Sequence, residues 1–175
     1  MSVSVVSRQS EDEILLGSVV DKAAAETGAK VVNEQHYSKL EHMYMTAPIN
    51  AFYSPRIWIS QGETVITTPV KPEFFHAADA VHGSVYFKLL DDAAFFSVNS
   101  LIEEYFALTA NFTTYLLRPI SEGTMKATGK VVYAAARSFI ADSVLVDDQG
   151  KEIARGSGNF VISKIKLTAD MGYRI

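Results

Sequence analysis

The stretch HGSVYFKLLDDAAFFSVNSL, from His82 to Leu101, decides the fold predicted for this chain. Wound at about 100° per residue, it has two apolar sides, one formed by Val85, Leu89, Ala93 and Phe96 and the other by Phe87, Ala94 and Val98. A helix that is apolar on nearly every side is normally buried in a core. The stretch therefore predicts a central buried helix around which the other elements pack.

Three charged residues, Lys88, Asp91 and Asp92, interrupt this helix near its middle. Lys88 and Asp92 form an i,i+4 pair, so Asp92 has a local partner and is expected to be structural. Asp91 points elsewhere, among aromatic and aliphatic residues of the same helix. Burying an unpaired carboxylate is costly and shifts its pKa. We interpret Asp91 as a functional residue; the alternative is a structural carboxylate bonded to a backbone or hydroxyl group.

Composition places the chain among soluble globular proteins. Its 175 residues fit one domain with a substantial core, and 48% of them are hydrophobic and 21% charged. The absence of cysteine excludes disulfides, thiolate metal sites and a thiol nucleophile. The first residues do not have the pattern of a secretory signal, and no uncharged apolar run reaches about 18 residues. We expect a cytoplasmic protein without a membrane span.

The charge is distributed unevenly along the chain. The net charge of −4 disfavours a general nucleic-acid binder. Residues 1–117 hold 7 Lys and Arg against 14 Asp and Glu, whereas residues 118–175 hold 9 against 6. The positive excess of the last third suits an anionic ligand, although scattered surface charges explain it equally well.

Two helices are predicted before residue 50. Ser10 and Glu13 have the spacing of a capping box, and apolar residues then recur at helical spacing until Gly28. A second helical stretch runs from about Glu34 to Met45. We expect this N-terminal addition to pack on the strands that follow; a lid over a ligand is the alternative.

From Arg56 the apolar period changes to two. Strands are expected at 56–60, 63–70, 106–117, 124–133, 138–146 and 152–163. Gln61-Gly62 predicts a hairpin between the first two, and turn residues separate the last four. Two strands, one helix and four strands make an α+β layout. Because short turns favour antiparallel neighbours, we expect a curved antiparallel sheet wrapped around the central helix.

The sequence His82-Gly83-Ser84, with Asp91 nine residues after His82, resembles the hotdog-fold acyl-CoA thioesterases, especially the PaaI-like branch. That branch typically has His-Gly-Gly followed by a carboxylate at this spacing. Its downstream features occur here in order, as Leu117-Arg118-Pro119, Glu122-Gly123, Asp147-Asp148-Gln149-Gly150 and Ala154-Arg155-Gly156-Ser157-Gly158-Asn159-Phe160. The resemblance covers about residues 56–163. It implies a hotdog domain at 51–167, preceded by a helical extension at 1–50 and followed by a C-terminal tail at 168–175.

The resemblance also implies roles for individual residues. It places the catalytic carboxylate at Asp91, the backbone N–H that polarises the thioester carbonyl at Gly83, and the hydroxyl that often holds the lytic water at Thr109. For Thr109, an ordinary strand position is the alternative.

The chain departs from the family pattern at two places. Six residues before His82 the family usually has Asn or Gln, and this chain has His76; Ser84 replaces the second Gly and is kept as a substrate-binding candidate. For His82, a hydrogen bond that fixes the loop is favoured over proton transfer. For His76, loop packing and substrate contact both remain open.

Helix geometry adds a constraint on such a site. Eight residues at about 1.5 Å each separate Gly83 from Asp91 by roughly 12 Å, so one carbonyl cannot touch both on one helix. A second chain running alongside in the opposite sense brings Gly83 of one subunit to Asp91 of the other. We therefore expect a homodimer or a dimer of dimers.

The substrate expected from the resemblance is an acyl-CoA, and Arg118 and Arg137, with Lys126 or Lys130, are candidates for its phosphates. No cofactor is expected. The spacing of His76, Asp79, His82 and Asp91 matches no metal-ligand pattern, so no metal is expected either.

The sequence thus favours an acyl-CoA thioesterase that releases a free acid and CoA. The alternative is a non-catalytic protein that binds acyl-CoA or an acyl chain in the same fold. A hotdog hydratase is disfavoured because the short His-Phe and Pro-Gly signature of that branch is missing. The acyl group and the choice between nucleophilic and general-base attack stay open.

Overall fold

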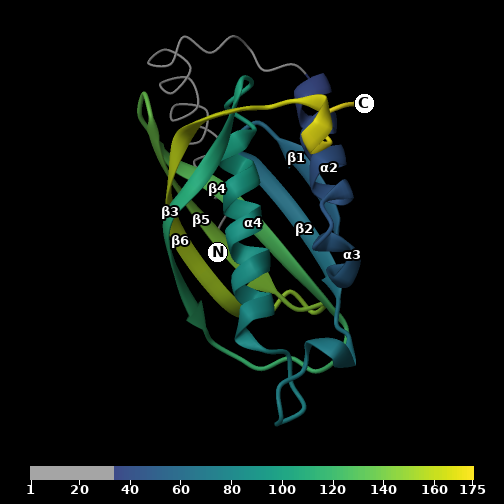
Figure 1. Ribbon diagram of the computed structural model, residues 1–175. Helices are drawn as coiled ribbons and strands as arrows, with labels where there is room; N and C mark the ends of the chain where they lie inside the picture. The colour runs from purple at the N-terminus through teal and green to yellow at the C-terminus, as the bar shows by residue number, and fades with distance from the viewer. Residues whose placement is uncertain (1–33) are drawn as a thin grey trace, which may run out of the picture.

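The long helix α4 (Gly83–Asn99) lies against one face of a curved six-stranded sheet (Figure 1). The computed structural model describes residues 34–175. The strands are β1 (Arg56–Ser60), β2 (Glu63–Pro69), β3 (Tyr105–Leu116), β4 (Thr124–Ala134), β5 (Ser138–Val146) and β6 (Glu152–Lys166). Their order in the sheet is β1-β2-β4-β5-β6-β3, and every neighbouring pair is antiparallel. The predicted α+β layout, an antiparallel sheet around one central helix, is confirmed.

The strands form where the period of two was found. Alternate residues of β1 and β5 are buried, as the pattern requires for a sheet with one face on the core. The predicted hairpin joins β1 to β2, and Gly62 occupies its turn with a φ of 72°, a conformation that favours glycine. The strands end within a few residues of their predicted bounds; β6 is the longest and continues three residues beyond Ser163.

The first apolar side of α4 forms the centre of the core. Val85, Leu89 and Ala93 are buried against the sheet. The helix approaches β4 closely at Gly129, where an added Cβ would lie 2.1 Å from the carbonyl oxygen of Ala93. A side chain at this position would push the helix off the sheet, so the absence of a Cβ at Gly129 sets the depth at which α4 packs.

The second apolar side of α4 is only partly covered. Ala94 and Val98 are fully buried as predicted, but Phe87 is 43% exposed. Its ring packs edge-to-face on Phe112 of β3, with 5.8 Å between ring centroids. The prediction that Phe87 is buried with the rest of this side was wrong for the single chain, because β3 is the last strand of the sheet and nothing described lies beyond it.

The predicted second helix is confirmed as α2 (Glu34–Thr46), which is followed by the short α3 (Asn50–Tyr53). The helix predicted from Ser10 to Gly28 lies outside the described residues. In Figure 1, α2 runs along the β1 edge of the sheet, and it contacts β1. No helix within residues 34–175 is long and apolar enough to cross a membrane.

The C-terminal segment packs on α2 and does not extend freely. After β6 the chain forms the short 3-10 helix η2 (Ala169–Met171). The ring of His42 is 2.7 Å from the carbonyl oxygen of Gly172, and the buried His36 ring contacts the Tyr173 hydroxyl at 2.6 Å and the Asn99 carbonyl oxygen at 2.9 Å. These contacts tie the end of the chain to α2 and to the end of α4.

Candidate active site

His82 caps the N-terminus of α4. Its Nδ1 accepts the backbone N–H of Ser84 at 3.1 Å, and the Ser84 hydroxyl lies 2.8 Å from the same nitrogen. A ring nitrogen that accepts an N–H carries no proton, so the proton of the neutral imidazole is on Nε2. The predicted role of His82 in fixing the start of the helix therefore has a physical basis, and the ring keeps one donor for a ligand.

His76 has the same arrangement in the loop before α4. Its Nδ1 accepts the backbone N–H of Ala78 at 3.1 Å, which also places the proton of the neutral ring on Nε2. The rings of His76 and His82 have centroids 6.5 Å apart and are inclined by 72°. Two imidazole N–H donors thus lie near each other at the start of the helix.

These residues line one pocket of about 710 Å³ together with Gly83, Ser84 and Arg118. Its apolar wall includes Leu116 and Leu117 at the end of β3. An added Cβ at Gly83 would lie 2.9 Å from a methyl carbon of Leu116, so a side chain there would displace that wall. The structure therefore brings together five of the site residues predicted from sequence, around the positive end of α4.

Asp91 lies in the middle of α4 and lines a second pocket of about 470 Å³. Its Oδ1 accepts a 3.1 Å hydrogen bond from the Thr109 hydroxyl of β3. The carboxylate is half-buried and has this polar partner, so the expectation of a buried, unpaired group was wrong. The walls around it are largely aromatic and aliphatic, with Phe95, Phe106 and Leu108 among them.

The environment of Asp91 makes it a stronger base than an ordinary aspartate. Burial, the largest effect, raises its pKa from 3.8 to about 6. The neighbouring charge of Asp92 adds to this increase, whereas the Thr109 hydrogen bond and the charge of Lys88 oppose it. A carboxylate with a pKa near 6 is ionised at neutral pH and still binds a proton readily.

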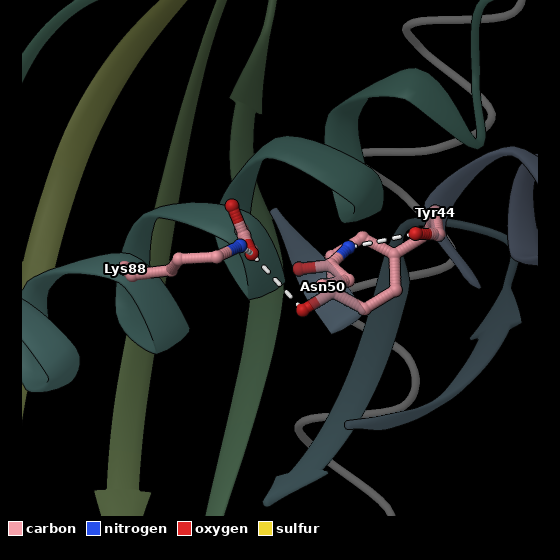
Figure 2. A network of polar contacts seen from close by, with 4 residues as sticks. Tyr44, Asn50 and Lys88 are labelled. Carbon is pink, nitrogen blue, oxygen red and sulfur yellow. Dashed lines mark hydrogen bonds and ion pairs between the residues drawn. The ribbon is translucent and has the colours of Figure 1, made fainter. Parts of the chain in front are cut away.

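Asp92 has the local partner that the sequence predicts. Its Oδ2 pairs with the ammonium of Lys88 and accepts a 3.0 Å hydrogen bond from the Tyr44 hydroxyl (Figure 2). Burial raises the pKa of Asp92, and Lys88 and Tyr44 act in the opposite direction. The Lys88–Asp92 pair is confirmed, and it also contacts α2.

The two pockets are separate within one chain. Gly83 and Asp91 are eight residues apart on the same helix, a separation of about 12 Å. Arg118 and Arg137 lie still farther apart, because their backbones bond to Ile153 and Ile162 at opposite parts of β6. Nine strand residues span about 30 Å. Arg137 lines neither pocket.

Sequence reasoning missed the contribution of α2 and α3 to the Asp91 pocket. Met43, Tyr44, Ile49 and Asn50 line it from this side. No spacing pattern could link them to Asp91, because they lie more than forty positions earlier. The only available signal was the alternative that the N-terminal addition is a lid over a ligand, which does not identify the residues that would line the site.

Comparison with known proteins shows which proteins this chain resembles. Residues 79–154 match the family model described as the thioesterase superfamily. The E. coli PaaI protein from the phenylacetic acid degradation operon has a similar structure, with 22% identity, a TM-score of 0.72, and coverage of 78% of this chain and 99% of that chain. The predicted resemblance to hotdog-fold thioesterases is confirmed. The sheet and α4 form a hotdog fold.

Other hotdog structures support the same assignment of the fold. A thioesterase family protein from Silicibacter pomeroyi is 22% identical and covers 73% of this chain and 97% of its own, with a TM-score of 0.67. A mutant thioesterase from Pseudomonas aeruginosa is 14% identical, with a TM-score of 0.65, and the match covers 74% of this chain and 94% of that chain. A search of the curated proteins found no match to this chain.

Within residues 34–175, no three His, Asp or Glu side chains are grouped as potential metal ligands. His82 precedes α4 and Asp91 lies in its middle, so the two line different pockets.

Proposed function

We propose that this hotdog protein is an acyl-CoA thioesterase that hydrolyses an acyl-CoA to a free acid and CoA. The observation that carries the proposal is Asp91, a carboxylate in the wall of an apolar pocket that is held by Thr109 and has a pKa of about 6. Such a group is suited to attack a thioester or to activate water, and the apolar walls suit an acyl chain.

Two chemical routes start from the ionised Asp91. As a general base, it takes a proton from water while the water oxygen bonds to the thioester carbon. As a nucleophile, its own oxygen bonds to that carbon to give an anhydride, which water then hydrolyses. In both routes the C–S bond breaks, the electron pair leaves with sulfur, and the thiolate of CoA takes up a proton.

The developing negative charge on the carbonyl oxygen requires hydrogen-bond donors. The proposal assigns this role to the backbone N–H of Gly83, at the positive end of α4. Support comes from the neighbouring rings of His76 and His82, whose accepting Nδ1 atoms leave Nε2–H as a donor. His76 would then supply the side-chain N–H that the family usually takes from Asn or Gln.

The proposed site is shared by two subunits, because Gly83 and Asp91 of one helix are about 12 Å apart. The outer edge of β3 is the surface on which we place the partner. Within the described residues no strand pairs with that edge, and exposed apolar residues accompany it, namely Phe87, Leu108, Tyr115, Leu116 and Leu117. An open strand edge with apolar side chains favours pairing with a second copy.

A two-fold axis at this edge pairs β3 with β3 and sets the α4 helices side by side in opposite directions. Gly83 of each subunit then faces the partner subunit's Asp91. Arg118 lines the Gly83 pocket and is assigned to the CoA moiety. Arg137 lies between β4 and β5, beside the far part of β6, and can serve the same CoA only from the other subunit. A dimer of dimers and the cytoplasmic location stay predictions.

A thiol-release assay tests the proposal. Purified protein is supplied with short-chain, long-chain and aromatic acyl-CoAs, and release of free CoA is followed. We expect turnover of at least one substrate, and Asp91→Asn should lower its kcat by about 10²–10⁴-fold without loss of binding. Binding of acyl-CoA without turnover across the whole panel would overturn the proposal and favour the non-catalytic binding protein.

A further inference from the structure

Residues of three helices form a polar cluster around Asp92, the residue that follows Asp91. Lys88 and Asp92 of α4 form its ion pair, and Tyr44 of α2 donates its hydroxyl to Asp92 (Figure 2). The Lys88 ammonium also lies over two aromatic rings, 5.3 Å from the centroid of Tyr44 and 5.1 Å from that of Tyr53 in α3. The ammonium is therefore held by one carboxylate and two ring faces.

The cluster is fixed from the side of α2 and α3. Tyr44 is 3% exposed, and its ring packs edge-to-face on Phe96 with 5.1 Å between centroids. The buried Asn50 at the start of α3 donates its side-chain N–H to the carbonyl oxygen of Tyr44 at 2.7 Å, as Figure 2 shows. These contacts hold the Tyr44 hydroxyl in place against Asp92.

Burial makes the charges of this cluster effective over short distances. The side chains of Lys88 and Asp92 are only 12% and 20% exposed. Charges in such surroundings are screened less by water than surface charges are. Asp91 precedes Asp92 by one residue and follows Lys88 by three, so both charges act on it: Asp92 raises its pKa and Lys88 lowers it.

The other groups around Asp91 leave few competing charges. From β3 it faces the neutral hydroxyl of Thr109. From α2 the titratable group is Tyr44, whose pKa is raised far above its ordinary value by burial and by Asp92, so it stays neutral. The remaining residues of the pocket wall are uncharged. Lys88 and Asp92 are thus the two charges in the described pocket that act on Asp91.

We infer that Lys88 and Asp92 are positioning residues that set the proton affinity of Asp91, and that Tyr44 holds Asp92 in place for this role from α2. The catalytic consequence rests on the proposed function, whereas the electrostatic effect on Asp91 does not. The two charges act with opposite sign. Removing the charge of Asp92 leaves Lys88 to stabilise ionised Asp91, and removing Lys88 leaves two carboxylates that repel each other.

The test is a carbon-NMR titration of the Asp91 carboxyl in the full chain, carried out on the wild type, Asp92→Asn and Lys88→Met. In Asp92→Asn, we expect the Asp91 pKa to fall by about one unit. In Lys88→Met, the Asp91–Asp92 pair is expected to take up its first proton at a pH higher by about one unit. Glu152→Gln is the matched control, because it removes a carboxylate from the exposed Glu152–Arg155 pair, and it should leave Asp91 unchanged.

A role in packing alone would give a different result. It would lower stability, measured by thermal unfolding, and reduce activity at every pH without moving the Asp91 titration. Shifts of the same sign in both variants, or no shift in either, would overturn the inference. Each substitution is expected to shift the Asp91 pKa in its own direction. One variant that folds is therefore sufficient for the test.

The pH profile connects the titration to the reaction. The acidic limb of kcat/KM should move with the Asp91 pKa in each variant. If the wild type hydrolyses no acyl-CoA, the proposed function fails, and the NMR titration still decides whether Lys88 and Asp92 act on Asp91.

Discussion

The hydroxyl of Thr109 donates a 3.1 Å hydrogen bond to Oδ1 of Asp91, and the two residues come from different elements that meet only in the folded chain, β3 and α4. The bond fixes one carboxylate oxygen and thereby orients the other. It also favours the ionised form of Asp91 against the effect of burial. This pair therefore controls both the direction and the charge of the proposed base.

Substitutions of Asp91 and of Thr109 should separate the effect of the carboxylate from the effect of its orientation. Asp91→Asn removes the base or nucleophile and should lower kcat by about 10²–10⁴-fold. Thr109→Val keeps the carboxylate and loses its orientation, so we expect a loss of about tenfold. Initial rates at saturating acyl-CoA measure kcat of both variants. Asp142→Asn, on the exposed side of β5, is the control, and full activity of Asp91→Asn would reject the assignment.

The raised pKa of Asp91 has a consequence for stability. The folded protein holds this proton up to about pH 6, whereas the unfolded chain releases it near pH 3.8. The folded state thus binds more protons between these values, and the contribution of Asp91 to stability decreases as pH rises through this window.

Above pH 6 the ionised Asp91 therefore destabilises the fold. Because the group stays in contact with solvent, the effect is smaller than the full shift implies, about 1–2 kcal/mol. Asp91→Asn should raise the free energy of unfolding by this amount at pH 7.5 and have little effect at pH 3.5. Urea unfolding at the two pH values measures it; destabilisation at pH 7.5 would contradict the prediction.

The donor role proposed for His76 predicts which substitutions are tolerated. Gln also presents a side-chain N–H, so His76→Gln should keep kcat within about fivefold, whereas His76→Phe should lower it by about 10–100-fold. Glu73→Gln, in the same exposed loop, controls for changes in the loop. Equal losses in the Gln and Phe variants would show that His76 has another role.

The shared site predicts that assembly and activity fail together. Phe87→Glu places a charge on the exposed ring position beside β3, so it should convert the dimer to a monomer and abolish hydrolysis. Trp58→Glu is the matched control, because Trp58 is 53% exposed on β1, the opposite edge strand. Sedimentation velocity and the thiol-release assay follow both. An active monomer of the Phe87 variant would reject the composite site.

Because α4 lies so close to β4, one added methyl group should have a large effect on the free energy of unfolding. In Gly129→Ala, the new Cβ would lie 2.1 Å from the carbonyl oxygen of Ala93. The helix must shift to relieve this overlap, which should cost about 3 kcal/mol. Thr128→Ala, the preceding residue of β4 with its side chain on the other face, should change the free energy of unfolding by less than about 1 kcal/mol. Equal stability of the two variants would refute the prediction.

Local periodicity was sufficient to predict the secondary structure. Val85, Leu89 and Ala93 are buried as their spacing predicts, and the Gln61-Gly62 turn joins β1 to β2. The same periodicity failed for Phe87, because it identifies an apolar side of a helix but not whether the same chain covers it. Whether a side of the helix is buried depends on where the sheet ends.

The candidate site was predicted only in part. The spacing of Gly83 and Asp91 on one helix follows from the sequence, since helical rise depends on residue number alone. Thr109 was selected only through the resemblance to a family, as a hydroxyl for the lytic water, and its hydrogen bond to Asp91 was not predicted. Tyr44 was not predicted, because it lies 48 positions before Asp92 and reaches it only through the packing of α2 on the core.

The sequence by itself determined the six strands, the helices α2 and α4, and the distance between Gly83 and Asp91, since each depends on interactions between residues close in the chain. Only the tertiary structure decided that Asp91 is held by Thr109, that His76 lies beside His82, and that α2 covers the Lys88–Asp92 pair. The physical reason is that such contacts depend on strand register and on the packing of side chains distant in sequence, which local patterns do not encode.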